Sequence, residues 1–242
     1  MGVMKRIFIS DLHLDQSQTI LRDALEQFLE THCSDADELY ILGDLFEAWI
    51  GDDDPREHSR TIVEMLRSLT CKLFIMHGNR DFLIGDRFCQ ETGAELLKDP
   101  SLISIGNENV LLSHGDAFCT LDQSYQKLRL ILRSKEFQRD FLQKELRERE
   151  FISQQMRGES RKHTGNVAEE IMDVTPESVI LAMEDNDVHR LIHGHTHRPA
   201  IHQHRLKHRV GLRYVLGDWR PSTTFLLTND TSYELKEFNF RV

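Results

Sequence analysis

Short apolar runs alternate along the chain with segments whose apolar residues recur at helical spacing, and a polar cluster follows each run. The runs are residues 6–10, 39–42, 72–77, 110–113 and 191–192. Between them, residues 20–29 and 62–69 place apolar side chains on one face of a helix, because a helix repeats every 3.6 residues. This alternation predicts an α/β layered fold whose polar residues gather at the strand ends, where such folds bind ligands.

Three other parts of the chain show different patterns. Pro176 is a good first residue for a helix, and residues 214–242 resemble strands separated by turns at Gly217, Pro221 and Asn229. The 42 residues from 116 to 157 contain neither Gly nor Pro, which favours long helices. We interpret residues 117–170 as a helical cap inserted into a single domain of residues 1–242. The alternative is a helical hairpin that only covers the sheet.

Apolar side chains are frequent in this predicted cap, and we expect them to line a chamber. They are Leu121, Tyr125, Leu128, Leu132, Phe137, Phe141, Phe151, Ile152 and Met156. Residues 127–170 carry 11 Lys and Arg against 8 Asp and Glu, a local charge of +3. The cap is therefore expected to be mildly basic.

Composition excludes several classes of function. The 30 Lys and Arg residues against 40 Asp and Glu give a formal net charge of −10, which argues against nucleic acid as a partner because its binding needs a basic surface. No apolar run approaches the roughly 18 residues of a membrane span, and residues 1–10 lack the pattern of a signal peptide. The 4 cysteines form no CxxC pair, which suits a reducing compartment. We expect a cytoplasmic protein.

Five short polar segments follow the predicted strands, and together they supply carboxylate, imidazole and amide groups. The candidate residues are Asp11, His13, Asp44, Asn79, His114, His195 and His197. A mixed oxygen and nitrogen set without thiolates suits Mn²⁺, Fe²⁺ or Zn²⁺. These seven residues are more ligands than one ion needs. They suffice for two ions if one carboxylate, most naturally that of Asp44, bridges the two ions.

The spacing within the segments has a physical interpretation. Alternate residues at a strand end point the same way, so Asp11 and His13 can reach one ion, as can His195 and His197. Glycines beside these residues allow tight turns. Each segment alone occurs by chance in many chains, but their joint occurrence at strand ends favours a metal site.

The order DxH, GD, GNxD, HGD, GHxH resembles the calcineurin-like metallophosphoesterase superfamily. That resemblance implies a two-sheet β-sandwich flanked by helices, with a two-metal site at the strand ends. More narrowly, the segments resemble the UDP-2,3-diacylglucosamine hydrolase family of lipid A biosynthesis, from the first strand to Gly217-Asp218-Trp219. Residues 46–54, with the sequence FEAWIGDDD, are the most specific part.

The narrower resemblance implies two Mn²⁺ ions per subunit and hydrolysis of the pyrophosphate of UDP-2,3-diacylglucosamine to UMP and 2,3-diacylglucosamine 1-phosphate by a metal-activated hydroxide. One ion would be held by Asp11, His13, Asp44 and His197, and the other by Asp44, Asn79, His114 and His195. The catalytic residues would be Asp44, Asn79, Arg80, His114 and His195. The substrate contacts would be Asn79, Arg80, Asp122, Tyr125, Arg157, Ser160, Thr164 and His195.

Two cap positions depart from the family pattern. Thr164 and Val167 stand where the family has amide and basic residues. Thr164 can still form hydrogen bonds but Val167 cannot, so recognition of the head group there would need Arg161 or Lys162.

Arg80 indicates the type of bond that is cleaved. Many relatives in the superfamily have histidine here, which can protonate an alkoxide leaving group, whereas arginine stays charged and cannot. Arginine can pair with phosphate oxygens, and a phosphate leaving group, with a second pKa of about 6, departs without a proton. Arg80 therefore favours cleavage of a pyrophosphate. The alternative is that Arg80 only braces Asp81.

Three hypotheses follow for the whole chain. The first is the lipid pyrophosphatase, which would bind the anionic cytoplasmic face of the inner membrane peripherally through the cap and take the acyl chains between the cap helices. The second is a general nucleotide pyrophosphatase or phosphodiesterase, which would not need an apolar chamber. The third is a scaffold without catalysis, which would be expected to have lost ligands. No protein partner follows from the sequence.

Overall fold

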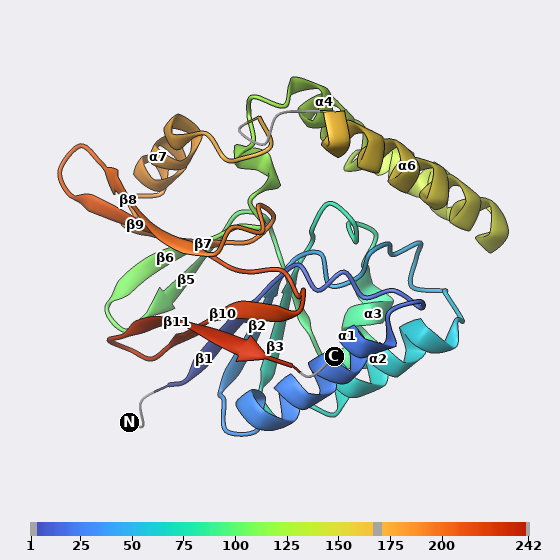
Figure 1. Ribbon diagram of the computed structural model, residues 1–242, viewed down its shortest axis with the longest axis horizontal. Coiled ribbons are helices and arrows are strands. Elements are labelled where there is room, and N and C mark those ends of the chain that lie inside the picture. The colour runs from blue at the N-terminus through green and yellow to red at the C-terminus, as the bar shows by residue number, and fades with distance from the viewer. Residues whose placement is uncertain (1–3, 167–170, 241–242) are drawn as a thin grey trace.

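Two mixed β-sheets packed face to face form the centre of the molecule, and helices cover their outer faces (Figure 1). The computed structural model describes residues 4–166 and 171–240, with side chains for 4–160 and 171–240. The first sheet has the order β11 (Tyr233–Asn239), β10 (Ser222–Thr228), β1 (Arg6–Ile9), β2 (Glu38–Leu42), β3 (Lys72–Met76) and β4 (Glu95–Leu97). The second has the order β5 (Ser101–Ile105), β6 (Glu108–Leu112), β7 (Arg190–His193), β9 (Val210–Val215) and β8 (Ala200–Arg205).

Strand alternation divides the apolar residues between two layers. Phe8, Tyr40 and Phe74 stack side by side with ring centroids 4.6 Å apart and face the second sheet, where they join Val110 and Ile192. The neighbouring strand residues point to the opposite face. There they pack against α1 (Thr19–Phe28), α2 (Glu57–Arg67) and α3 (Asp86–Thr92). Helix α7 (Pro176–Asp185) covers the outer face of the second sheet in the same way.

Helices α4 (Gln123–Leu132), α5 (Lys135–Leu142) and most of α6 (Leu146–Asn166) occupy the stretch without Gly and Pro, and α6 continues beyond it. They lie between β6 and α7 in the chain, and α4 and α6 lie together above the sheets in Figure 1.

The five short apolar runs are strands β1, β2, β3, β6 and β7, as the hydrophobic pattern predicts. The division into one domain with an inserted cap over 117–170 stays a prediction, and residues 167–170 of it lie outside the described part of the chain.

Candidate metal centre

The fold brings the predicted ligands to one edge of the sandwich. Strands β1, β2 and β3 are parallel neighbours in one sheet, and β6 and β7 are parallel neighbours in the other. Asp11, Asp44 and Asn79 follow the first three strands, while His114 and His195 follow the last two. Since parallel strands end at the same edge, residues far apart in sequence meet there.

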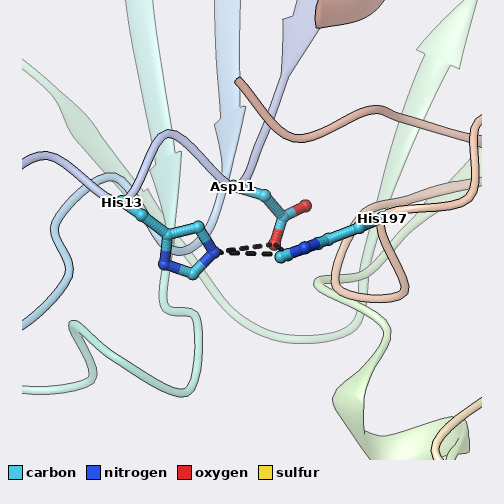
Figure 2. Close-up of side chains that lie close together, drawn as sticks. All are labelled: Asp11, His13 and His197. Atoms are coloured by element: carbon cyan, nitrogen blue, oxygen red, sulfur yellow. Dashed lines mark hydrogen bonds and ion pairs between the residues drawn. The ribbon is translucent and has the colours of Figure 1, made fainter. Parts of the chain in front are cut away.

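One group of side chains surrounds Asp11. Figure 2 shows His13 and His197 approaching its carboxylate from two sides. The distance from Asp11 Oδ1 to Nε2 is 3.4 Å for His197 and 4.0 Å for His13, and the two Nε2 atoms are 3.2 Å apart. The Oδ2 atom of Asp44 lies 3.8 Å from Nε2 of His13. These are the four residues that the family resemblance assigns to one ion.

The second group shares Asp44 with the first. Its Oδ1 atom lies 3.8 Å from Nε2 of His114. The Oδ1 atom of Asn79 lies 3.0 Å from that nitrogen and 2.9 Å from Nδ1 of His195. The two carboxylate oxygens of Asp44 thus face different groups, which places Asp44 where a bridging ligand would stand.

The chemistry of both groups suits divalent cations. Asp11 and Asp44 are 0% and 2% exposed, and Oδ1 of Asp11 is buried without a hydrogen bond. A buried carboxylate oxygen is costly unless a positive partner compensates it. Carboxylate and imidazole atoms that converge in this way fit Mn²⁺, Fe²⁺ or Zn²⁺.

The pKa values of the histidines reflect this concentration of charge. Burial lowers the pKa of His114, but the carboxylates of Asp44 and Asp11 outweigh burial and raise it to about 9. Burial and the charge of His114 lower the pKa of His195 to about 4. Because a ligating histidine must be neutral, His195 is ready to bind a cation, whereas cation binding at His114 releases a proton.

The ligand residues adopt an uncommon backbone conformation. Among the residues that the structure describes, six that are not glycine have a left-handed φ, and five of these are candidate ligands: Asp11 (56°), His13 (51°), Asp44 (53°), His195 (68°) and His197 (55°). Such conformations cost about 1–3 kcal/mol each and cluster at functional sites. Our explanation by strand alternation is therefore wrong for both pairs, because β1 ends at Ile9 and β7 at His193, before the ligands, and the chain then turns.

Two glycines permit the close approach of these loops. A Cβ atom at Gly78 would overlap the carboxylate of Asp44, and one at Gly194 would overlap the Asp11 carboxylate and the Ser10 hydroxyl. The two residues therefore provide space beside the carboxylates, rather than the tight turns that the sequence led us to expect at these positions.

Asp81, which the sequence analysis names only as a residue that Arg80 could brace, is buried and holds two of the loops together. Its carboxylate accepts hydrogen bonds from the backbone N–H groups of Leu45 and Gly78, both at 2.8 Å, and of Asp44 at 3.3 Å. The guanidinium of Arg80 instead donates to the Ser160 hydroxyl at 3.3 Å. The structure therefore does not support the alternative in which Arg80 braces Asp81.

Two further carboxylates that the sequence did not assign face the outer nitrogens of the histidines. Glu47 lies 3.2 Å from Nδ1 of His13, and Asp218 lies 3.5 Å from Nδ1 of His197. Such partners would fix the ring so that its Nε2 atom can bind a cation. Two features of the sequence could have pointed to these residues. Glu47 lies in the specific segment 46–54, and Asp218 lies in the Gly217-Asp218-Trp219 motif.

Asp116 connects the ligand loops to α4. Its buried carboxylate accepts hydrogen bonds from the Tyr125 hydroxyl at 2.6 Å and from Arg129 at 2.8 Å. Tyr125 in turn stacks beside His195, with ring centroids 6.1 Å apart. This arrangement places the inner face of α4 against the candidate metal centre.

A cavity of about 280 Å³ extends from the ligand groups beneath α4, α5 and α6. Its polar end contains Asn79, Arg80, Tyr125, Arg157 and Ser160. Ten further lining residues are apolar: Ala48, Trp49, Ile50, Phe82, Leu83, Leu128, Leu132, Phe137, Phe141 and Met156. The other four are Glu47, Ser124, Ser153 and Glu159. The cavity thus has a polar end beside the candidate metal centre and an apolar end beneath the helices.

The structure corrects part of the predicted lining. Phe151 and Leu121 are 60% and 59% exposed and do not line the cavity, because they lie on the outer side of their segments. Ile152 is not a lining residue either, and it packs against the core cluster. Asp122 caps the N-terminus of α4, where its carboxylate accepts a hydrogen bond from the backbone N–H of Tyr125 at 2.9 Å, so it has a structural role besides the predicted substrate contact. The side chains of Arg161, Lys162 and Thr164, and all of Val167, lie outside the described residues.

Comparison with known proteins agrees with this geometry. The calcineurin-like phosphoesterase family matches residues 4–199. The UDP-2,3-diacylglucosamine hydrolase of Pseudomonas fluorescens (strain SBW25) is 45% identical, covering 97% of this chain and 95% of the relative. The enzyme of the same name from Chromohalobacter salexigens is 42% identical, covering 98% and 99%. Vacuolar Protein Sorting 29 from Cryptosporidium parvum, at 15% identity, shares the fold with a TM-score of 0.51, covering 100% of this chain and 93% of that one.

Proposed function

The chain belongs to the calcineurin-like phosphoesterase family and, within it, to the UDP-2,3-diacylglucosamine hydrolases, and we propose that it hydrolyses the pyrophosphate of this lipid to UMP and 2,3-diacylglucosamine 1-phosphate. As a member of this family it is a metal-binding hydrolase. The observation that carries the substrate assignment is the cavity, which begins at Asn79 and Arg80 and continues between apolar side chains. A general nucleotide pyrophosphatase would have no use for that apolar end.

Two Mn²⁺ ions are the proposed cofactors. Asp11, His13, Asp44 and His197 would hold one of them, and Asp44, Asn79, His114 and His195 the other. Such ions lower the pKa of a bound water and offset charge on the phosphoryl oxygens. Asp81 keeps the Asp44 and Gly78 loops together, and Glu47 and Asp218 orient two of the histidines.

Arg80 is the proposed contact for the pyrophosphate. Its guanidinium lines the polar end of the cavity, and its Nε is buried without a hydrogen-bond partner. A donor of this kind suits a phosphate oxygen, since charge-assisted hydrogen bonds are strong. Tyr125, Arg157 and Ser160 line the same end of the cavity and, with Asp122 and Thr164, are proposed substrate contacts.

The substrate assignment is tested by the Leu128→Asp variant with two substrates. Leu128 lines the cavity yet is 45% exposed, so the variant is expected to fold, whereas Phe141 is 5% exposed and belongs to the core. We expect the KM for the long-chain substrate to rise at least tenfold, because a carboxylate beside an acyl chain costs more than the roughly 1.4 kcal/mol of a tenfold change. The KM for a water-soluble analogue with short acyl chains should stay within twofold.

Equal responses of the two substrates would contradict an acyl-binding cavity. Equal turnover of the lipid and of UDP-glucosamine by the wild-type protein would favour the general nucleotide pyrophosphatase. Both reactions are measured with Mn²⁺ added, and elemental analysis of the Mn²⁺-loaded protein is expected to give two ions per chain.

We propose that the protein is cytoplasmic and binds the cytoplasmic face of the inner membrane peripherally. Among the described residues, no helix combines the length and apolar content needed to cross a bilayer. Helix α4 turns Arg129 towards Asp116, while Leu130 and Ile131 are 71% and 57% exposed. The outer face of α4 also carries the exposed Lys127, and α4 contains no acidic residue. An apolar face with a cation suits an anionic lipid surface.

The membrane proposal is tested by replacing Leu130 and Ile131 together with aspartate. Because burial of each side chain contributes about 1.5–3 kcal/mol, we expect co-sedimentation with anionic vesicles at low salt to weaken at least tenfold. Leu181→Asp on α7, which alters a leucine that is 59% exposed elsewhere, is the matched control. Binding that is unchanged in the double variant would show that α4 does not contact the membrane.

A further inference from the structure

The specific segment 46–54 has contacts that the metal centre does not explain. Beyond Glu47, which contacts His13, the backbone N–H of Trp49 donates to the Arg80 carbonyl at 3.2 Å. The segment then continues away from the ligands to Asp53, which meets α6. It therefore connects the loops of the metal centre with the helix above them.

The contact with α6 is made by Arg149, whose side chain is only 3% exposed. Its two terminal nitrogens donate to the two carboxylate oxygens of Asp53, at 2.7 and 2.5 Å. The first of them also donates to the backbone carbonyl of Ile50 at 2.8 Å. A buried guanidinium is costly unless it is paired. The two terminal nitrogens of Arg149 are paired with this loop, while its Nε is buried without a hydrogen-bond partner, so the side chain keeps its place only while the loop does.

Gly51 shows that the loop is shaped around this side chain. Its φ is +133°, and a Cβ atom there would overlap the Arg149 guanidinium. Any other residue would push Arg149 out of the loop or force the loop to open. The glycine of the specific segment is therefore explained by its contact with α6.

The same helix contacts the polar end of the cavity further along. Arg157 pairs with Asp15 at 3.2 Å, and the Ser160 hydroxyl accepts from Arg80 at 3.3 Å. Ser160 lies eleven residues beyond Arg149, roughly 16 Å along a helix that rises 1.5 Å per residue. Figure 1 shows α6 as one continuous helix over the sheets. Fixing its first turn therefore fixes where Arg157 and Ser160 lie.

We propose that Asp53 and Arg149 are a positioning pair that holds α6 over the metal centre and so sets the place of Arg157 and Ser160 beside Arg80. The inference rests on the proposed function for its kinetic effect. Neither residue touches the reacting atoms. The pair determines how well the polar end of the cavity fits the substrate, and not whether the ligands assemble.

The test compares Arg149→Met with Arg147→Met, which alters an exposed arginine two residues earlier on the same helix. For Arg149→Met we expect kcat/KM for the lipid substrate to fall roughly ten- to a hundredfold, the range that a displacement of about 1 Å can cause. The metal content per chain should stay at the wild-type value. Arg147→Met should match the wild type in both measurements.

Asp53 offers the second and milder variant, since its side chain is 54% exposed. Asp53→Asn should repeat the kinetic loss, and Asp53→Glu should recover most of it. Amide hydrogen exchange measures how firmly α6 is held, and it needs no substrate. In Asp53→Asn we expect the amides of α6 to exchange faster than in the wild type, while the exchange rates of β1–β3 stay the same. A general loss of stability would accelerate exchange in all of these elements.

Wild-type kcat/KM and wild-type exchange of α6 in folded Asp53→Asn would overturn the positioning pair. Failure of the proposed function looks different, because the wild-type protein itself would then not hydrolyse the lipid. In that case the exchange measurement still decides whether the pair holds α6.

Discussion

Replacing Asp44 with alanine is expected to lower turnover by at least three orders of magnitude. Asp44 has one carboxylate oxygen facing His13 and the other facing His114. Its loss removes the proposed bridge, and with it the chemistry that bound ions supply, which is worth several kcal/mol. The measurement is kcat together with the metal content per chain, and we expect both to fall.

Asp44 has a left-handed φ of 53°, so a control must show what replacing a residue in this backbone conformation does by itself. Asp187 also has a left-handed φ, of 49°, but its side chain is 96% exposed. Asp187→Ala should therefore leave turnover unchanged, while Asp44→Asn, which keeps the shape and removes the charge, should resemble Asp44→Ala. Near-normal activity in either Asp44 variant would contradict the bridging assignment.

Much of the fold was predictable because burial leaves a simple pattern. A strand that is covered on both faces is mainly apolar, and β1, β2 and β7 are recognisable by their short apolar cores. Strand β8 is at the edge of its sheet and alternates between exposed and half-buried residues. Its sequence, AIHQHR, is rich in polar residues, so hydrophobicity alone did not reveal it.

The ligand types were predictable, but the reason for their convergence was not. The residue types and their place after strands are visible in the sequence, whereas a left-handed φ at an aspartate or histidine leaves no signature there. The partners of the ligands were missed for a similar reason. Asp81 acts through backbone N–H groups from other loops, and only the folded chain brings these groups to its carboxylate.

Side-chain direction in the helices was the least predictable feature. Leu128 and Phe151 are both apolar residues of a helical stretch, yet only Leu128 lines the cavity. The helical period shows which residues share a face, but it does not tell which face turns inward. In α4 that choice follows from Asp116, because its buried carboxylate draws Arg129 and Tyr125 inward and leaves Leu130 outside.

Arg80→His is expected to lower pyrophosphate hydrolysis by roughly 10²–10³-fold, the usual loss when one charged donor to the transition state is removed. The backbone N–H of residue 80 donates to Oδ1 of Asp44 at 2.8 Å, and this bond survives the substitution, so the ligand loops should keep their shape. The variant loses the permanent charge beside Ser160 and gains a group that can give up a proton. Its activity on alkyl phosphodiesters, whose leaving group needs that proton, should therefore fall less or even rise.

The ratio of the two activities decides whether Arg80 acts on the leaving group. Arg80→Lys is the matched control, because it keeps the charge without the planar pair of donors and cannot supply an acid at neutral pH. We expect the ratio of diester to pyrophosphate hydrolysis to rise at least tenfold in Arg80→His and to stay near the wild-type value in Arg80→Lys. A ratio that is the same in all three proteins would mean that Arg80 holds α6 through Ser160 and has no part in selecting a phosphate leaving group.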